Sequence, residues 1–307
     1  MPPVAVHELR AAGRTLTLGE RPWLMGIVNA SPDSFSDGGE RGTLERRVEL
    51  AAELLEAGAD IIDVGGESGV TTTPAVDPDV EIARVVPLVE RVAGELGAPV
   101  SVDTYKPAVA RAAIEAGACM VNDVSGLRDP ALARVCAEAG AALVLMHTYA
   151  PPKRKLLDPA NDGRVTADVV AFLRDRMELA AEQGLSAEHI VLDPGPDFGK
   201  TPAQTVESLR GLDAVLELGR PVLLAISRKD FVGAVTGRPP RERGAGTLAA
   251  LAWGVDAGAH LFRVHDVAAA ADFLAVRAVL RGEREIDRDA RLAEDLRREP
   301  PGARPPG

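Results

Sequence analysis

The sequence of 307 residues predicts one α/β domain, a (β/α)8 TIM barrel, on the basis of a repeated motif and a regular alternation of segments. The motifs "EAGAD" (56–60), "EAGAC" (115–119), "EAGAA" (138–142) and "DAGAH" (256–260) each follow a long segment rich in Ala, Leu, Val, Glu and Arg. Each also precedes a short apolar run. Glycine just past a helical segment ends a helix, and a continuously apolar run is typical of a strand covered on both faces.

This unit of helix, glycine and strand predicts eight strands. The strands are Trp23–Asn29, Asp60–Gly65, Pro99–Asp103, Cys119–Asp123, Ala142–His147, His189–Asp193, Pro221–Ile226 and His260–Val264. Eight helical segments are predicted at residues 43–57, 78–96, 107–116, 130–139, 165–183, 203–218, 244–257 and 267–281. Eight alternations favour a barrel. A doubly wound open sheet is the alternative, but its usual GxGxxG fingerprint after the first strand is absent from the sequence.

The two ends of the chain differ from the barrel in composition. Residues 1–21 predict a small hairpin or cap over the bottom of the barrel, which itself spans residues 22–281. In residues 282–307 Arg balances Asp and Glu, apolar residues become rare, and Pro and Gly end the sequence. This tail predicts a short charged helix followed by disorder.

Composition argues against several classes of protein. The net charge is −11 and the sequence lacks a long basic patch, which disfavours nucleic-acid binding. The most basic short stretch, "PPKRK" (151–155), is interpreted as a solvated loop. No apolar run approaches the ~18–20 residues of a membrane span, and no secretory signal is recognisable. Two cysteines, Cys119 and Cys136, do not form a disulfide framework, so a reduced, cytoplasmic setting is expected.

Polar residues stand at the carboxyl ends of the predicted strands, where barrels of this type carry their active sites. The first strand ends in Asn29 and leads into the polar segment "SPDSFSDGG" (31–39), and other strands carry Asp63, Asp103, Asn122 or Asp193. Carboxylates that close apolar runs need cations or ligand donors as partners, because burying them unpaired is costly. His147, at the end of the fifth strand, is interpreted either as a ligand or as a strand cap.

Cations are confined to the last two strands of the predicted barrel, where Lys229, Arg263 and His265 lie. The loops after strands seven and eight of such barrels often bind phosphate. Carboxylates on the other strands suit a ligand rich in N–H donors, such as a heterocycle with a guanidine-like edge. We therefore expect a phosphate or diphosphate attached to a donor-rich ring.

Several motifs in order resemble the dihydropteroate synthases, a family of pterin-binding barrels. They are "MGIVNASPDSFSDGG", "ADIIDVGGES", "SVDTYKPAVARAAIEAGACMVNDVSGLRDP", "LVLMH", "LDPGPDFGKT", "SRKDFVG" and "LFRVHDV", within about residues 22–281. The resemblance implies that p-aminobenzoate displaces diphosphate from 6-hydroxymethyl-7,8-dihydropterin diphosphate to give 7,8-dihydropteroate in folate biosynthesis. It also implies a homodimer, to which residues 244–260 could contribute.

The resemblance also implies roles for residues that match the motifs. Asn29 would bind Mg²⁺ on the leaving diphosphate, and Arg263 and His265 would hold that diphosphate. Asp193 and Asn122 would pair with the pterin's amino and ring N–H groups, between walls formed by Met146 and Phe198. Asp103 would stabilise positive charge as the C–O bond breaks, Lys229 would contact the pterin's acceptors, and Ser227 would help to seat the p-aminobenzoate carboxylate. Asp103, Lys229 and Arg263 are thus the expected catalytic residues.

Three departures from the family pattern concern mainly the second-substrate side. The second-strand loop reads "ESGVTTTPAV" (67–76) where the family usually has Glu-Ser-Thr-Arg-Pro-Gly, so its arginine is missing. Asp197 precedes Phe198, and Ala225 stands before "ISRK" where glycine is frequent. In these features the chain resembles the divergent second copy of the enzyme found in some actinobacteria. A pterin-binding homologue with weak or no synthase activity and a pterin-dependent methyltransferase are therefore alternative functions.

Overall fold

The computed structural model describes residues 4–31, 44–68, 73–293 and 296. The predicted loop residues 32–39, the departing loop residues 69–72 and most of the last fourteen residues lie outside these ranges. The chain divides into two units, Met1–Ala271 and Asp272–Gly307. The domain bounds indicated by the sequence stay a prediction.

The first unit contains the predicted barrel. Within the described residues, eight parallel strands are paired in the order β8-β7-β6-β5-β4-β3-β10-β9. Their bounds are β3 (Trp23–Asn29), β4 (Ile61–Gly65), β5 (Val100–Asp103), β6 (Met120–Asp123), β7 (Ala142–Met146), β8 (Ile190–Asp193), β9 (Leu223–Leu224) and β10 (Leu261–Val264). The barrel closes between β8 and β9 through one bridge, from Leu192 to Val222.

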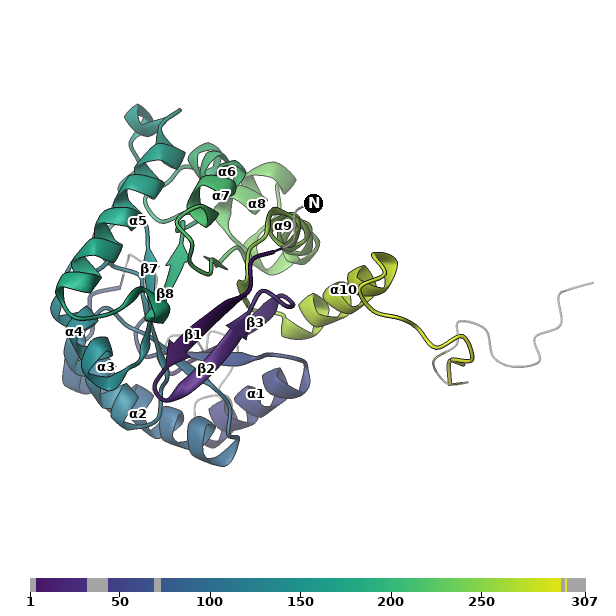
Figure 1. Ribbon diagram of the computed structural model, residues 1–307, viewed down its shortest axis with the longest axis horizontal. Coiled ribbons are helices and arrows are strands. Elements are labelled where there is room, and N and C mark those ends of the chain that lie inside the picture. The colour runs from purple at the N-terminus through teal and green to yellow at the C-terminus, as the bar shows by residue number, and fades with distance from the viewer. Residues whose placement is uncertain (1–3, 32–43, 69–72, 294–295, 297–307) are drawn as a thin grey trace, which may run out of the picture. The chain divides into compact units, whose positions relative to one another are not determined.

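Helices surround the strands, as Figure 1 shows for α1 to α6. The helices are α1 (Leu44–Glu56), α2 (Pro78–Glu95), α3 (Pro107–Glu115), α4 (Ala131–Ala139), α5 (Val165–Glu182), α6 (Pro202–Arg210), α7 (Leu212–Leu216), α8 (Asp230–Thr236), α9 (Gly244–Ala257) and α10 (Val267–Leu280). Short 3-10 helices are η2 (Pro159–Asn161), η3 (Ala187–His189) and η4 (Pro240–Glu242).

The glycine of each repeated motif ends a helix as predicted. Gly58, Gly117, Gly140 and Gly258 all have positive φ angles, between 64° and 114°, which glycine adopts without steric strain. The predicted helix over residues 203–218 is instead two helices, α6 and α7, which meet at Gly211. The prediction also missed α8, a helix of seven residues that is the next element after the seventh barrel strand.

A hairpin of β1 (His7–Ala11) and β2 (Arg14–Leu18) lies across one end of the barrel (Figure 1). Leu9 and Leu18 are buried in a core cluster with residues near the amino ends of the barrel strands, such as Met25, Ile61 and Met120. The hairpin therefore closes the end of the barrel opposite to the carboxyl ends of the strands.

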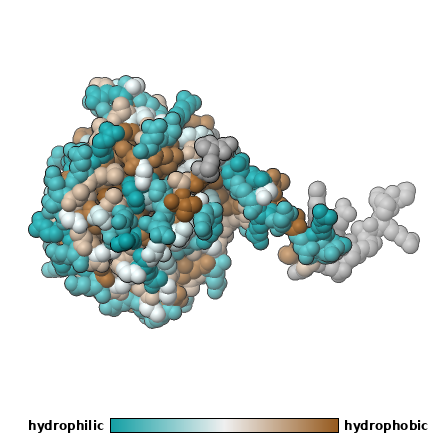
Figure 2. Space-filling view, viewed as in Figure 1, coloured by the Kyte–Doolittle hydropathy of each residue, from teal (hydrophilic) through white to brown (hydrophobic). Residues whose placement is uncertain are grey.

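The surface of the protein is mixed in polarity. Hydrophilic side chains cover most of the face seen in Figure 2, and hydrophobic ones are scattered between them. The helices of the described ranges include none that is long and apolar enough to cross a membrane.

Candidate active site

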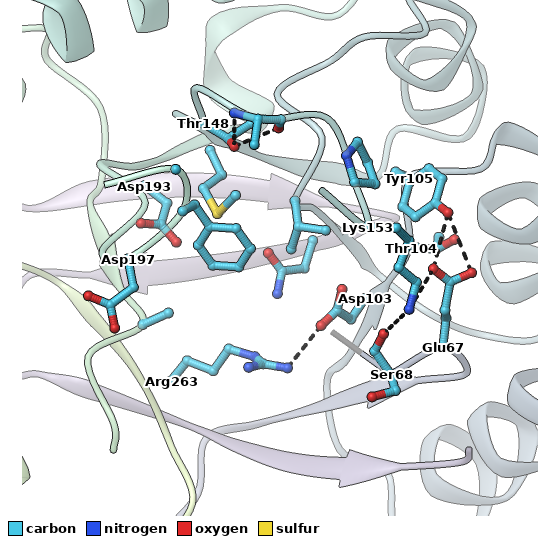
Figure 3. A pocket seen from close by; sticks show the side chains of 18 of the residues that line it. Glu67, Ser68, Asp103, Thr104, Tyr105, Thr148, Lys153, Asp193, Asp197 and Arg263 are labelled. Carbon is cyan, nitrogen blue, oxygen red and sulfur yellow. Dashed lines mark hydrogen bonds and ion pairs between the residues drawn. The ribbon is translucent and has the colours of Figure 1, made fainter. Parts of the chain in front are cut away.

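A cavity of about 610 Å³ opens at the carboxyl ends of the barrel strands (Figure 3). Nine of the residues singled out in the sequence line it: Asn29, Asp103, Asn122, Met146, Asp193, Phe198, Lys229, Arg263 and His265. The tenth, Ser227, lines an adjoining cavity of about 360 Å³ that shares Lys229, Arg263 and His265 with the first. The structure thus brings together the residues that the sequence placed on separate strands.

Strand register explains why these side chains converge. Asn29 pairs with Gly65, Gly65 with Asp103, and Asp103 with Asn122, so three polar side chains and one glycine form one level of the barrel. Parallel strands in register place their carboxyl ends at one edge of the sheet.

Arg263 rises into this level from below. It pairs in register with Met25, which is four residues before Asn29 on the same strand. Its Nε lies 2.6 Å from Asp63 Oδ2, and its Nη2 lies 2.9 Å from Asp103 Oδ2. Figure 3 shows the guanidinium directed at Asp103. Asn122 Nδ2 donates to the same Asp63 oxygen at 3.3 Å. Two carboxylates therefore fix the orientation of this cation.

Two carboxyl groups of the cavity have perturbed pKa values. Burial raises the pKa of Asp103 to about 7, although the charge of Arg263 opposes this shift. Burial also raises the pKa of Asp193 to about 6, against the hydrogen bond from the Gly195 N–H, at 2.7 Å, and the charge of Lys229. At neutral pH Asp193 is therefore mainly ionised and Asp103 is about half protonated. A ligand with N–H groups favours the ionised form of both.

The loop after β8 forms one wall of the cavity. Phe198 places its ring centroid 4.4 Å from the Nζ of Lys229, which is a cation–π contact. Lys200 donates to the carbonyl oxygen of Gly195 at 2.8 Å and holds this loop from behind. A side chain at residue 195 would clash, because its Cβ would lie 1.9 Å from the carbonyl oxygen of His147.

His265 and Ser227 meet at the edge where the two cavities join. The Nδ1 of His265 lies 2.9 Å from the Ser227 Oγ, and the His265 main-chain N–H donates to the same oxygen at 3.3 Å. Desolvation and the neighbouring cations Arg228, Arg263 and Lys229 lower the pKa of His265 to about 4. The imidazole is therefore neutral at pH 7 unless an anion binds beside it.

His147, for which the sequence left two interpretations, lies behind the cavity. Its ring packs edge-to-face against Tyr149 and Phe172, with centroid distances of 4.7 and 5.0 Å. It is buried and does not appear among the residues that line the cavity. Desolvation strongly lowers the pKa of its imidazole.

Sequence reasoning missed a buried ionic cluster on the opposite side of the cavity. Lys106 Nζ lies 2.6 Å from Glu67 Oε2 and 2.7 Å from the Val76 carbonyl oxygen, and it also contacts Glu81. Tyr105 donates its hydroxyl to Glu67 at 3.1 Å. The available signal was "TYKP" directly after the third barrel strand, which places a lysine at the rim.

The interpretation of residues 151–155 as a solvated loop holds for Arg154 and Lys155, which are exposed, but is wrong for Lys153. Lys153, with a positive φ of 63°, has a side chain only 13% exposed and lies in the cavity wall. Its Nζ donates to the Ser68 carbonyl oxygen and lies 3.4 Å from Glu67 Oε1 (Figure 3). It also donates to Thr73 Oγ1 at 3.1 Å. A cation thus reaches the loop that lacks the family's arginine, from a segment far away in the sequence.

Asp197 and Ala225, the other two departures from the family pattern, also line the cavity. Asp197 lines it, and its carboxylate accepts hydrogen bonds from Thr205 Oγ1 at 3.0 Å and from the main-chain N–H of Asp230. Ala225 lines it with a side chain that is almost buried. Protein donors therefore already satisfy the Asp197 carboxylate.

The chain is similar to known pterin-binding enzymes. The family described as "Pterin binding enzyme" matches residues 25–265. Dihydropteroate synthase of Bacillus subtilis is 42% identical over 253 residues, which cover 82% of this chain and 86% of that protein. Among solved structures, dihydropteroate synthase of Xanthomonas albilineans with 4-aminobenzoic acid aligns with a TM-score of 0.80 and 42% identity. The same enzyme in complex with 7,8-dihydropteroate aligns with a TM-score of 0.79 and 43% identity. Each of these two alignments covers 89% of this chain and 98% of the other.

The ion pairs of Arg263 predict that an isosteric substitution of one partner lowers the stability of the protein strongly. Asp63→Asn removes the charge that lies 2.6 Å from Arg263 Nε, and breaking a buried pair costs about 3–5 kcal/mol of unfolding free energy. Urea denaturation at pH 7.5 measures this loss. As a control, Glu138→Gln breaks the pair with Arg111, whose side chains are about half exposed, and changes stability by at most about 1 kcal/mol. Equal losses of unfolding free energy for the two substitutions would show that the Arg263–Asp63 pair stabilises the protein no more than an exposed pair does.

Proposed function

Because the chain belongs to the family of pterin-binding enzymes, we propose that it is a dihydropteroate synthase. As a transferase, it joins the 6-hydroxymethyl-7,8-dihydropterin group to the nitrogen of p-aminobenzoate and releases diphosphate. The observation that carries this proposal is that one cavity joins buried carboxylates, Asp103 and Asp193, to the cations Lys229 and Arg263. Relatives and structural neighbours named dihydropteroate synthase match most of the chain.

The pterin ring has complementary partners on one side of the cavity. We assign its amino and ring N–H groups to Asp193 and Asn122, because a carboxylate and an amide oxygen accept such donors. Met146 pairs in register with Asp193 and supplies an apolar wall, and Phe198 supplies another. Lys229 donates to the acceptors of the ring. Positioning by several fixed groups lowers the entropy cost of reaction.

The bond change requires charge stabilisation at the other end of the ring. As the C–O bond breaks, positive charge grows on the pterin methylene carbon, and we assign its stabilisation to Asp103. Arg263 and His265 face the leaving diphosphate, and Ser227 helps to seat the carboxylate of p-aminobenzoate. The amine nitrogen then forms the new C–N bond, and no covalent intermediate with the protein is needed.

The chemistry of the donor set fits Mg²⁺ bound together with the diphosphate. Asn29 has an exposed side chain that lines the cavity, and the described residues offer its amide no hydrogen-bond partner. Groups of three or more His, Cys, Asp or Glu suited to a metal are absent from the described residues. One protein oxygen suits a Mg²⁺ that takes its other ligands from phosphate and water. When bound there, such an ion would neutralise charge on the leaving group.

We also propose a cytoplasmic location and a homodimer. Cys119 and Cys136 are both buried free cysteines, which suits a reducing compartment. Trp253 on α9 is 39% exposed, and aromatic residues are enriched in interfaces. Sedimentation velocity of the wild type and of Trp253→Ala tests the homodimer. If Trp253 anchors the interface, its loss raises the dissociation constant of the dimer.

The alternatives account for less of the cavity. A methyltransferase has no leaving diphosphate and therefore no use for Arg263, His265 and Asn29 together. A binding protein without activity has no use for a carboxylate that stabilises developing positive charge, which is the role assigned to Asp103. An assay of the purified protein distinguishes the synthase from these alternatives. It supplies pterin diphosphate, Mg²⁺ and p-aminobenzoate and measures diphosphate release. We expect the wild type to release diphosphate only when p-aminobenzoate is present. We expect Asp193→Asn to show no such p-aminobenzoate-dependent release. Pterin binding without release would refute the synthase activity.

The raised pKa of Asp193 predicts how pterin affinity depends on pH. The ionised carboxylate accepts the pterin donors, so affinity falls as pH drops through about 6. Between pH 7.5 and pH 5 the dissociation constant of 6-hydroxymethylpterin rises about tenfold, measured by fluorescence titration. Asp193→Asn binds weakly at both values. The free energy of unfolding depends on pH in the opposite direction. The folded protein holds the Asp193 proton more tightly than the unfolded chain, in which the carboxyl has its ordinary pKa of 3.8. The stability that this group contributes therefore decreases as pH rises from about 4 to 6.

The magnesium assignment predicts a ligand-specific effect. Removing Mg²⁺ with EDTA weakens binding of the pterin diphosphate about tenfold or more, because the ion would neutralise charge on the phosphate groups. Binding of 6-hydroxymethylpterin, which has no phosphate, stays the same. Asn29→Ala reduces the Mg²⁺ dependence of diphosphate binding in the same calorimetric titration. An equal effect of EDTA on both ligands would contradict the assignment.

A further inference from the structure

We propose that Asp197 is a positioning residue, which holds Phe198 and Lys229 in the cavity wall by joining the loop after β8 to the start of α8. The inference deepens the proposed function and rests on it, because Phe198 and Lys229 belong to the assigned pterin site. Four observations on the described residues lead to it: the weak strand pairing at this point, the contacts of the carboxylate, the backbone conformation of the loop, and the charges around Lys229.

The wall that carries Phe198 and Lys229 has little main-chain pairing beneath it. β8 and β9 are joined by the single bridge between Leu192 and Val222, and β9 has only two residues. By contrast, β3 and β4 pair over five residues. The spacing between the ends of β8 and β9 therefore depends on contacts outside the sheet.

Asp197 supplies such a contact above this seam. Its main-chain N–H donates to Thr205 Oγ1 at 3.0 Å, and the same hydroxyl lies 3.0 Å from Asp197 Oδ1. Its other carboxylate oxygen accepts the main-chain N–H of Asp230, the first residue of α8. One side chain thus connects the loop after β8 with the chain after β9, at the residue next to Lys229.

The backbone of the loop suits this arrangement. Asp197 has a φ of +67°, between Gly195 and Gly199, which both have a φ of +66°. Asp and Asn are the residues other than glycine that most often adopt this left-handed conformation. Asp197 therefore combines the required backbone conformation with a carboxylate, which glycine lacks.

The charge of Asp197 also acts on Lys229. Burial lowers the pKa of Lys229, and the carboxylate of Asp197 is the foremost of the charges that oppose this shift. Asp193 and Asp230 act in the same direction, whereas Arg263 acts in the opposite one. The other charged or titratable groups around Lys229 include Lys200, Arg228 and His265. Arg243 also lies beside it and donates from Nη1 to the Lys229 carbonyl oxygen at 3.1 Å. Asp197 thus favours the charged ammonium that donates to the ring.

Two substitutions separate geometry from charge. Asp197→Gly keeps the left-handed backbone and removes the carboxylate, so the connection to Asp230 is lost. Asp197→Asn keeps a side-chain oxygen that accepts a hydrogen bond and removes only the charge. Asp213→Asn, at an exposed position on α7, is the matched control for the change of an aspartate to an asparagine.

The experiment measures 6-hydroxymethylpterin affinity, kcat and KM from pH 6 to 10, and melting temperature for the four proteins. We expect Asp197→Gly to weaken pterin binding about tenfold, as for a lost charge-assisted hydrogen bond. In Asp197→Asn the alkaline limb of the kcat/KM profile moves to lower pH by about half a unit or more. Asp213→Asn matches the wild type in each measurement.

The possible failures are distinguishable. A wild-type protein that binds no pterin overturns the proposed function and, with it, this inference. If the wild type binds pterin, and both Asp197 variants melt cooperatively with wild-type affinity and an unchanged pH profile, only the role of Asp197 is overturned. A fall in melting temperature with unchanged affinity and profile likewise assigns Asp197 a purely structural role and overturns the inference.

Discussion

The active-site end of the barrel depends on one cation buried between two carboxylates. The Arg263 guanidinium contacts both Asp63 and Asp103, and Asp63 is completely buried. An ion this deep in a protein is tolerable only with paired charges. The three groups therefore require each other. Together they form a polar floor where a barrel interior would otherwise be filled with branched apolar side chains, and the space above this floor is the cavity.

Much of this architecture was predictable because its determinants are local. Apolar runs and glycine stops mark strands and helix ends, and the first predicted strand, Trp23–Asn29, has the same bounds in the structure. The residues at the strand ends converge because strand order in a barrel follows chain order. The clustering of Asn29, Asp103 and Asn122 on one level therefore follows from the fold itself.

Long side chains from loops could not be placed in this way. Lys153 follows the fifth barrel strand but contacts Ser68 and Thr73, which follow the second. Lys106 similarly bridges Glu67 and Glu81. Such contacts depend on how the loops fold back over the rim, and neither periodicity nor capping residues encode that. The basic stretch around Lys153 therefore looked like a solvated surface although it lies in the cavity wall.

The hairpin of β1 and β2 determines how ligands reach the catalytic groups. Leu9 and Leu18 are buried beneath the amino ends of the strands, so within the described residues the hairpin covers that end of the barrel and the cavity lies at the other. Two substrates that meet in the cavity would then both enter past the rim at the carboxyl ends of the strands, and a joined product would leave past the same rim.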